Sequence, residues 1–263
     1  MQINPKISIV TVVLNDAERL HTTASNVAQL SYDNIEYIVI DGGSSQETLE
    51  VIHSFKDRID AYLIEQDEGL YHAMNKGIDL ATGEWIIFMN AGDKFVNKNV
   101  LTTIFKVRNY DDYDILYGDV NVSYSGFQTF QQAGNMIDIR KGMQFCHQSV
   151  LIRLSYHKSN NYNIQNKMCA DFEFFYHAAN QNIPFLKLNE VIANVTPLGI
   201  SDRNREIVYY SWWKIIGFND IKLNFLYMYK IMIAFLKRII KLLLPKKTVY
   251  LIVKKINKIK LIK

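Results

Sequence analysis

Carboxylates that follow apolar runs are the residues of this chain best placed to do chemistry. Asp93 comes after the apolar run Trp85–Met89 and a short turn, so we expect its carboxylate to project where a diphosphate could sit. Mg²⁺ and Mn²⁺ commonly bind through one or two carboxylates together with phosphate oxygens, so a single Asp can suffice. The alternative is that Asp93 caps a helix beginning near Val96.

A second carboxylate, Asp41, ends the apolar run Ile35–Ile40 and opens a turn of two glycines and two serines. The open backbone of such a turn would let a nucleotide approach closely, although the same residues also make an ordinary strand-to-helix turn. Thr11 and Asn15 bracket the end of the first apolar run. They could add hydrogen bonds to a base or ribose, or serve only the turn.

The segment EQDEGLYHAMNKG, residues 65–77, contains a third group of candidates that includes Asp67. Tyr71 and Asn75 share one side of a predicted helix by their i, i+4 spacing. Lys76 lies next to that face and could offer its charge to a phosphate. The alternative for this segment alone is that Lys76 is solvated and that Asn75 only ends a helical turn, without a binding role for either.

Continuous apolar runs alternate with helical spacers through most of the chain. This alternation predicts an α/β fold with a mostly parallel central sheet flanked by helices. Polar residues that follow successive strands would then meet in one crevice. We expect strands at Ile7–Leu14, Ile35–Ile40, Ala61–Gln66, Trp85–Asn90, Asp114–Tyr117 and Phe185–Ala193, and helices at Ala17–Leu30, Gln46–Phe55, Tyr71–Ala81, Asn97–Val107 and Asp171–Asn180.

Composition and charge exclude several classes of protein. The chain has 263 residues, 49% of them hydrophobic, which is enough for a large core. Its two cysteines lack CxxC spacing and no apolar signal segment opens the sequence, so we expect a cytoplasmic protein without a disulfide framework. Residues 221–263 contain twelve Lys or Arg and no acid, whereas the other 220 residues carry 18 basic and 26 acidic side chains, a net charge of −8. An acidic body argues against nucleic-acid binding.

Four motifs in series resemble the family 2 inverting glycosyltransferases of the GT-A fold. They are DGGSS (41–45), the block at 65–77, ATGEW (81–85) and FMNAGD (88–93), and the resemblance covers residues 5 to 200. It is closest to the bacterial branch that builds capsular, exopolysaccharide and O-antigen chains. The resemblance implies a nucleoside diphosphate sugar at the strand ends, bound by the candidates above.

The same resemblance assigns the metal and donor contacts around residue 93. Asp93 matches the last carboxylate of the metal-binding DxD motif, which would hold Mg²⁺ or Mn²⁺. This sequence departs from the motif at Asn90 and Gly92, so one carboxylate remains, and weak metal binding without the donor is expected. His147, followed by Gln148, resembles the family's His-Gln pair near the transferred sugar; a buried structural histidine is the alternative.

Inversion at an anomeric carbon requires a base opposite the leaving diphosphate to take the proton of the acceptor hydroxyl. Asp171 is the best match to the family's base. Many relatives have Glu-Asp where this chain has Ala170 before Asp171, so Glu173 stays a second candidate. A helix cap at Asp171 is the structural alternative.

The basic C-terminal tail predicts a helix that lies on a membrane. Its longest uninterrupted apolar stretch, Ile231–Leu236, is far shorter than a bilayer span. Lys and Arg near anionic lipid would hold such a helix on the inner face of the plasma membrane, with the pattern interrupted at Pro245. A helical oligomer contact, or a helix packed back on the acidic body, is the competing explanation. We therefore divide the chain into a transferase domain at 1–204 and a tail at 205–263.

The function expected from these patterns is transfer of a hexosyl or N-acetylhexosaminyl unit from a nucleoside diphosphate sugar to a lipid-linked or growing surface polysaccharide. Polyprenyl-linked or oligosaccharide acceptors are implied by the resemblance alone, and so is a preference for UDP sugars. A nucleotidyltransferase of sugar metabolism is one alternative, but its basic, Gly-rich loop after the first strand is replaced here by Leu14-Asn15-Asp16-Ala17. An inactive, membrane-bound nucleotide-sugar binding subunit is the other.

Overall fold

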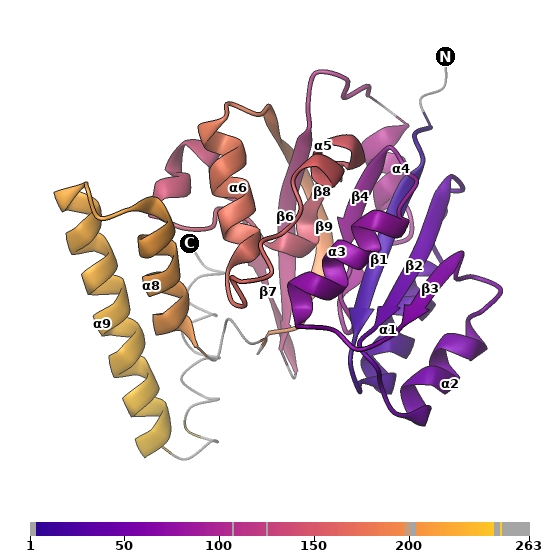
Figure 1. Ribbon diagram of the computed structural model, residues 1–263, viewed down its shortest axis with the longest axis horizontal. Helices are drawn as coiled ribbons and strands as arrows, with labels where there is room; N and C mark the ends of the chain where they lie inside the picture. The colour runs from indigo at the N-terminus through magenta and orange to yellow at the C-terminus, as the bar shows by residue number, and fades with distance from the viewer. Residues whose placement is uncertain are drawn as a thin grey trace.

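A computed structural model of the chain describes residues 4–106, 108–124, 126–197, 199, 204–244 and 248. In this part of the chain one sheet runs through the molecule in the order β3-β2-β1-β4-β8-β6-β9-β5, with β7 paired to β6. Helices cover both faces of the sheet, and two C-terminal helices lie at the end remote from β3 (Figure 1). The expected α/β class with a mostly parallel central sheet flanked by helices is confirmed.

The N-terminal half of the sheet is parallel. β1 pairs with β2 on one side and with β4 on the other, and β2 pairs with β3. Each connection between these strands carries a helix on one face, as parallel strands require. The elements are β1 (Ile7–Val13), α1 (Ala17–Val27), β2 (Ile35–Asp41), α2 (Gln46–Ser54), β3 (Ala61–Ile64), α3 (Leu70–Leu80) and β4 (Trp85–Phe88).

The second half mixes strand directions. β8 runs antiparallel to β4 and β6, while β6 and β9 are parallel to each other, with a register shift near Asp119. β5 and β7 add antiparallel edges. The elements are β5 (Lys94–Phe95), α4 (Val100–Phe105), β6 (Ile115–Tyr124), β7 (Phe127–Gln131), η1 (Met136–Lys141), η2 (His147–Ser149), β8 (Val150–Arg153), α5 (Leu154–Ser159), α6 (Ala170–Asn180) and β9 (Phe185–Val195).

Alternation along the strands builds a core on each face of the sheet. In β1, Ile7 and Ile9 join the cluster that includes α1, α2 and α4, whereas Val10 and Val12 join the cluster that includes α3, α5 and α6. All four side chains are buried. The two-faced burial explains why the strands read as continuous apolar runs.

The expected elements agree with the structure in type, and their bounds shift by a few residues. β6 extends seven residues past Tyr117. The helix expected at Asn97–Val107 is shorter in the structure, where α4 covers Val100–Phe105. Residue 107 lies outside the described residues. The edge strands β5 and β7 were not expected. Both are short: β5 depends on pairing with the distant strand β9, and β7 forms a hairpin with β6.

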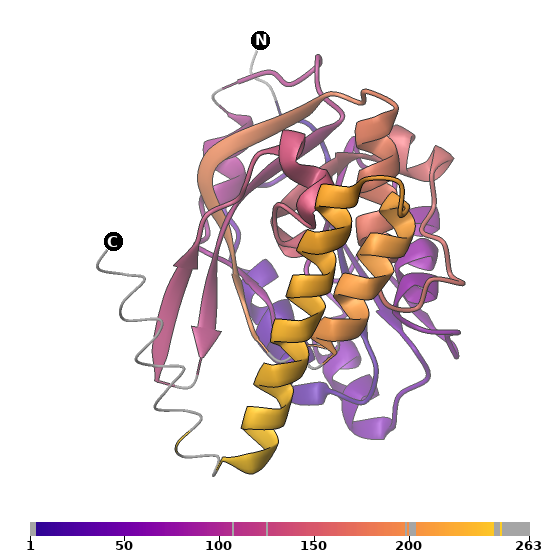
Figure 2. The same cartoon turned by 90° about the vertical axis from the view of Figure 1, so that its left-hand side faces the viewer.

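The C-terminal elements are α8 (Arg205–Ile216) and α9 (Ile221–Leu243). They form an antiparallel pair that lies beside α6 and η1 (Figures 1 and 2). Asp220 begins α9, because its carboxylate accepts the backbone N–H groups of Lys222 and Leu223. The predicted interruption at Pro245 and the rest of the basic tail lie outside the described residues, apart from residue 248.

Candidate active site

Asp41 is the last residue of β2 and is completely buried. Its Oδ1 accepts the backbone N–H groups of Gly43 at 3.0 Å and Ser44 at 2.7 Å. Its Oδ2 is buried without a hydrogen-bond partner among the described residues. A buried carboxylate oxygen without a donor is costly, so this atom is suited to a ligand that brings an N–H or O–H group.

Asn15 closes the same turn from β1. Its backbone N–H donates to Ser44 Oγ at 2.7 Å, and its Oδ1 accepts the backbone N–H of Ser45 at 2.8 Å. Ser45 begins α2 but makes no capping bond with its side chain. Asn15 therefore organises the turn beside Asp41 and stays exposed at the edge of the sheet.

Thr11 does not reach this edge, which corrects the expectation of a donor contact. It is fully buried in the middle of β1, where its Oγ1 donates to the Met89 carbonyl at 2.7 Å and accepts from Tyr37 Oη at 3.1 Å. The hydroxyl is thus used within the core. Spacing from the end of a predicted strand could not reveal this, because a shift of one residue turns a side chain to the other face.

Lys76 is paired with two acids, against the expectation that its charge is available to a diphosphate. Its Nζ lies 2.5 Å from Asp67 Oδ1 and 2.8 Å from Glu65 Oε1, and it also donates to the Gln66 carbonyl. Desolvation lowers the pKa of Lys76, but the bonds to Asp67 and Glu65 outweigh this and raise it. Lys76 therefore fixes the loop that carries Asp67, which remains a candidate donor contact.

Asp93 is buried beside the turn that follows β4. Its Oδ1 accepts the Thr196 backbone N–H at 3.0 Å and its Oδ2 accepts Gln148 Nε2 at 2.9 Å. Burial raises the pKa of Asp93 to about 6, opposed by these two bonds and by the charge of Arg19. The capping alternative is wrong, because the next helix, α4, begins at Val100 with Asn99 as its cap.

The oxygen atoms at this turn fit a hard divalent cation. Asn90 places a buried Oδ1 without a hydrogen-bond partner next to the segment that carries Asp93. No group of three or more His, Cys, Asp or Glu side chains gathers anywhere in the described part of the chain. An ion at Asp93 would therefore complete its coordination with donor phosphate oxygens.

Gly92 explains why this turn lacks the second carboxylate of the family motif. Its φ is +97°, and a Cβ there would meet Arg19 Cδ at 2.9 Å. A side chain at position 92 would therefore strain the backbone and displace Arg19. The turn is built for glycine.

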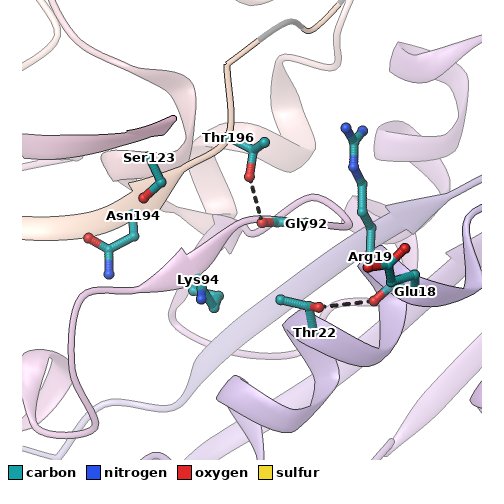
Figure 3. Close-up of a pocket in the computed structure, with 8 residues that line it drawn as sticks. All are labelled: Glu18, Arg19, Thr22, Gly92, Lys94, Ser123, Asn194 and Thr196. Carbon is teal, nitrogen blue, oxygen red and sulfur yellow. Dashed lines mark hydrogen bonds between the residues drawn. The ribbon is translucent and has the colours of Figure 1, made fainter. Parts of the chain in front are cut away.

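A hollow of about 190 Å³ opens beside this turn (Figure 3). Figure 3 shows Thr196 bonded to the Gly92 carbonyl at one side and α1 residues at the other. Asp93 and Asp171 are absent from its lining, so we do not assign the donor to this hollow. Its walls are Glu18, Arg19, Thr22, Gly92, Lys94, Ser123, Asn194 and Thr196.

Asp171 lies in the first turn of α6. The helix begins at Ala170 with Cys169 as its cap, so the capping alternative for Asp171 is wrong. Its Oδ1 accepts Tyr71 Oη at 2.8 Å and the Phe172 backbone N–H at 2.8 Å. Burial raises the pKa of Asp171, although both bonds oppose the rise. A carboxylate with a raised pKa is a better proton acceptor than a solvated one.

Glu173, the second candidate base, is engaged elsewhere. Its carboxylate accepts the side-chain amides of Asn163, at 3.1 and 3.3 Å, and of Asn166, at 2.7 Å. These bonds tie α6 to the preceding loop. The contacts favour Asp171 over Glu173 as the base.

Tyr162, which sequence reasoning missed, joins His147, the neighbour of Gln148, to Tyr71, the partner of Asp171. The side-chain amide of Asn75 donates to the Tyr162 carbonyl at 2.9 Å and accepts the Tyr162 backbone N–H at 3.0 Å. His147 Nε2 lies 2.6 Å from the Tyr162 hydroxyl. The ring of Tyr162 contacts that of Tyr71 with centroids 5.4 Å apart. Tyr162 lies in an irregular loop, so no periodic pattern pointed to it.

Three expected donor contacts are therefore parts of a scaffold. Asn75 holds Tyr162, Tyr71 holds Asp171, and His147 is a buried, neutral histidine because burial lowers its pKa to about 4. The residue after His147 is Gln148, which binds Asp93. A path of contacts thus runs from Asp93 to Gln148, and from the next residue in the chain, His147, through Tyr162 and Tyr71 to Asp171.

The sheet order and the carboxylates at the strand ends define a GT-A-type α/β protein. Residues 8–179 match the family described as glycosyl transferase family 2. The chain therefore belongs to glycosyl transferase family 2, as the motifs predicted.

Relatives and solved structures agree with this assignment. The PGL/p-HBAD biosynthesis glycosyltransferase of Mycobacterium tuberculosis is 30% identical over 178 residues, which are 65% of this chain and 68% of the relative. Staphylococcus aureus TarS 1-349 in complex with UDP-GlcNAc has a TM-score of 0.63 at 17% identity, over 84% of this chain and 69% of that one. The mannosyltransferase PcManGT of Pyrobaculum calidifontis, with GDP-Man and Mn²⁺, has a TM-score of 0.60 at 12% identity, over 78% and 60%.

Proposed function

We propose that this chain is an inverting glycosyltransferase. It moves a hexosyl or N-acetylhexosaminyl unit from a nucleoside diphosphate sugar to a lipid-linked or growing surface polysaccharide. The observation that carries the proposal is the path that joins Asp93 to Asp171 through Gln148, its chain neighbour His147, Tyr162 and Tyr71. In the proposal, the candidate metal ligand and the candidate base act on the same anomeric carbon from opposite sides.

The donor is a UDP sugar in this proposal. Two backbone N–H groups already occupy Asp41 Oδ1, so Oδ2 has room for one strong donor. The imide of uracil presents a single N–H, whereas guanine presents two neighbouring N–H groups that suit a carboxylate with both oxygens open. TarS in complex with UDP supports this preference, and PcManGT with GDP-Man marks the alternative.

The leaving diphosphate is held at Asp93 and Asn90. Mg²⁺ or Mn²⁺ bound there with the donor would neutralise the charge that develops on the diphosphate. The Mn²⁺ complex of PcManGT supports a divalent ion. Gln148 and the Thr196 amide orient the Asp93 carboxylate, so its geometry is set before the donor arrives.

Asp171 takes the proton. Tyr71 holds Oδ1, so Oδ2 accepts the proton of the acceptor hydroxyl while that oxygen attacks the anomeric carbon. The bond from this carbon to the diphosphate oxygen breaks as the new glycosidic bond forms. The diphosphate leaves with the electron pair, and the sugar is inverted without a covalent enzyme intermediate.

The test is a single-turnover assay with Asp171→Asn and Asp93→Asn, with Glu173→Gln on the same helix as the matched control. We expect each Asp variant to lose roughly 10²- to 10⁴-fold in rate, as removal of an acid-base or charge-stabilising group does. Glu173→Gln should change the rate far less. NMR of the product should show the opposite anomeric configuration to the donor.

Retention of configuration, or full activity of Asp171→Asn, would refute the mechanism. Binding of nucleotide sugars without any transfer by the unmodified protein would instead favour the inactive binding subunit. A screen of UDP, GDP, CMP and dTDP sugars, with and without Mn²⁺, identifies the donor. Selective binding of a GDP sugar that Asp41→Asn does not alter would remove the argument from Asp41.

We propose that the protein builds surface polysaccharides at the cytoplasmic side of the plasma membrane. The Mycobacterium tuberculosis relative is named for PGL/p-HBAD biosynthesis rather than for capsule or O-antigen. The capsular and O-antigen branch therefore remains a prediction. Transfer to a polyprenyl-linked acceptor, rather than to a soluble oligosaccharide, would support it.

A further inference from the structure

The helix α9 has two apolar faces, and one of them is exposed. Ten large apolar side chains on this helix are between 37% and 77% exposed. At about 100° per residue these positions cover an arc of roughly 140°, wider than the narrow seam of a coiled coil. They are Ile221, Phe225, Met228, Tyr229, Met232, Phe235, Leu236, Ile239, Ile240 and Leu243, which we call the outward face of α9.

The opposite face of α9 holds it against the body. Leu223, Tyr227 and Ala234 are buried, and the hydroxyl of Tyr227 donates to the Arg140 carbonyl of η1 at 3.0 Å. The ring of Trp213 in α8 stacks on Tyr227. Packing on the body, expected as a competing explanation for the tail, therefore describes this inner face and leaves the outward face uncovered within the described residues.

Charge distinguishes the possible occupants of the outward face. The helix α9 carries five basic residues and no acidic one, and Lys222 and Lys237 are exposed. A second copy docked through the same face would bring these like charges together, which opposes association. An anionic lipid surface complements them, and the remainder of the chain at 1–220 has a net charge of −8 that such a surface repels.

We propose that the outward face of α9 docks the protein on an anionic lipid bilayer, with the helix lying in the plane of the interface. Phenylalanine, tyrosine and methionine side chains enter the acyl boundary, and the lysines contact phosphate head groups. Every described helix falls short of the combined length and apolar content of a membrane span. This proposal goes beyond the transferase activity and needs neither donor nor turnover.

Docking would also orient the site, a step that rests on the proposed function. Phe172, the neighbour of Asp171, packs in one cluster with Val208 of α8, and its ring lies 5.0 Å from that of Trp212. The pair α8 and α9 is therefore connected to the first turn of α6. A lipid-linked acceptor would approach Asp171 from the membrane side.

The experiment is flotation of the full-length protein with vesicles of phosphatidylcholine alone or mixed with phosphatidylglycerol. The unmodified protein should float with the mixed vesicles, and added salt should weaken this. The double variant Met232→Gln, Phe235→Gln should reduce partitioning roughly tenfold or more, because two large apolar groups are lost. Lys222→Gln with Lys237→Gln should reduce it by roughly tenfold, since each lysine contributes to binding anionic lipid.

Phe130→Gln on β7 is the matched control, because Phe130 is 51% exposed and Phe235 is 54% exposed. It should float like the unmodified protein, and so should Asp171→Asn, which separates docking from catalysis. The side chains substituted on α9 and β7 are exposed, and thermal unfolding checks that each variant is folded. Failure to bind mixed vesicles, or equal binding by the Met232/Phe235 variant, overturns the proposal. A lipid-free dimer that this variant dissociates would assign the face to a second copy instead.

Discussion

The residues that connect the two acids are held to one another by hydrogen bonds. Asn75, His147 and Tyr71 converge on Tyr162 or Asp171, and each uses its polar atoms within the protein. A catalytic carboxylate must be held to within a fraction of an ångström, so such supporting side chains matter as much as the acids they hold. Their motif-like spacing fits this scaffold, and direct contact with the donor stays a prediction.

Tyr71→Phe should slow transfer by roughly tenfold while leaving KM for the donor nearly unchanged, since a positioning bond is lost. The Tyr71 hydrogen bond lowers the pKa of Asp171, so its removal raises that pKa further. The base must be deprotonated to act, and the acid limb of the pH–rate profile should therefore move to higher pH. The profile of kcat for both proteins measures this; an unmoved acid limb would contradict the role of Tyr71.

The helix α3 packs closely on the sheet at Gly77. A Cβ at Gly77 would lie 2.5 Å from Val10 Cγ1, so only glycine allows α3 to rest on β1 and β2 at this depth. The same helix carries Tyr71 near its start. The fit of α3 to the sheet thus sets the position of the residue that holds Asp171.

Gly77→Ala should destabilise the protein by about 1–3 kcal/mol, because the added methyl group overpacks the core. Urea unfolding measures the change in the free energy of unfolding. Asp79→Ala, on the exposed side of the same helix, is the control and should lie within about 0.5 kcal/mol of the unmodified protein. Equal stability of both variants would show that α3 can shift away from β1 without cost.

Much of the fold could be predicted from the sequence, because buried parallel strands are continuous apolar runs that alternate with helical segments. Asp41 and Asp93 could be located for the same reason, since each follows a strong strand. Thr11 could not, because its face depends on the strand register. The role of Lys76 could not, since its acidic partners lie in a loop whose path only tertiary packing decides, and the role of Tyr162 could not, since Tyr162 itself lies in such a loop.

At the scale of the whole molecule, α8 joins the basic tail to the catalytic half of the sheet. Trp212 packs on Phe172 in the small cluster that also contains Ile139, Cys169 and Val208. The transferase domain at 1–204 and the tail at 205–263 therefore share a packed boundary in the described residues. We keep this division as a proposal about function, with chemistry in the first part and attachment in the second.

Trp212→Ala should lower the free energy of unfolding by roughly 2–4 kcal/mol and reduce kcat, because it leaves a cavity against the first turn of α6. Tyr210→Ala on the same helix is the control, since Tyr210 is 52% exposed. Thermal or urea unfolding and single-turnover rates report the two effects. A loss of stability with an unchanged rate would mean that Asp171 does not depend on the tail.

The bond between Tyr71 and Asp171 joins residues 100 positions apart, and Thr11 is bonded to a residue 78 positions further along. Contacts so distant in sequence close late during folding. A nascent chain on the ribosome therefore has no functional centre until α6 has left the exit tunnel, and β5 and β6 must wait longer still for their partner β9. Until β9 is made, the unpaired edges of these strands are open to wrong pairing, and we expect chaperones to shield them during synthesis.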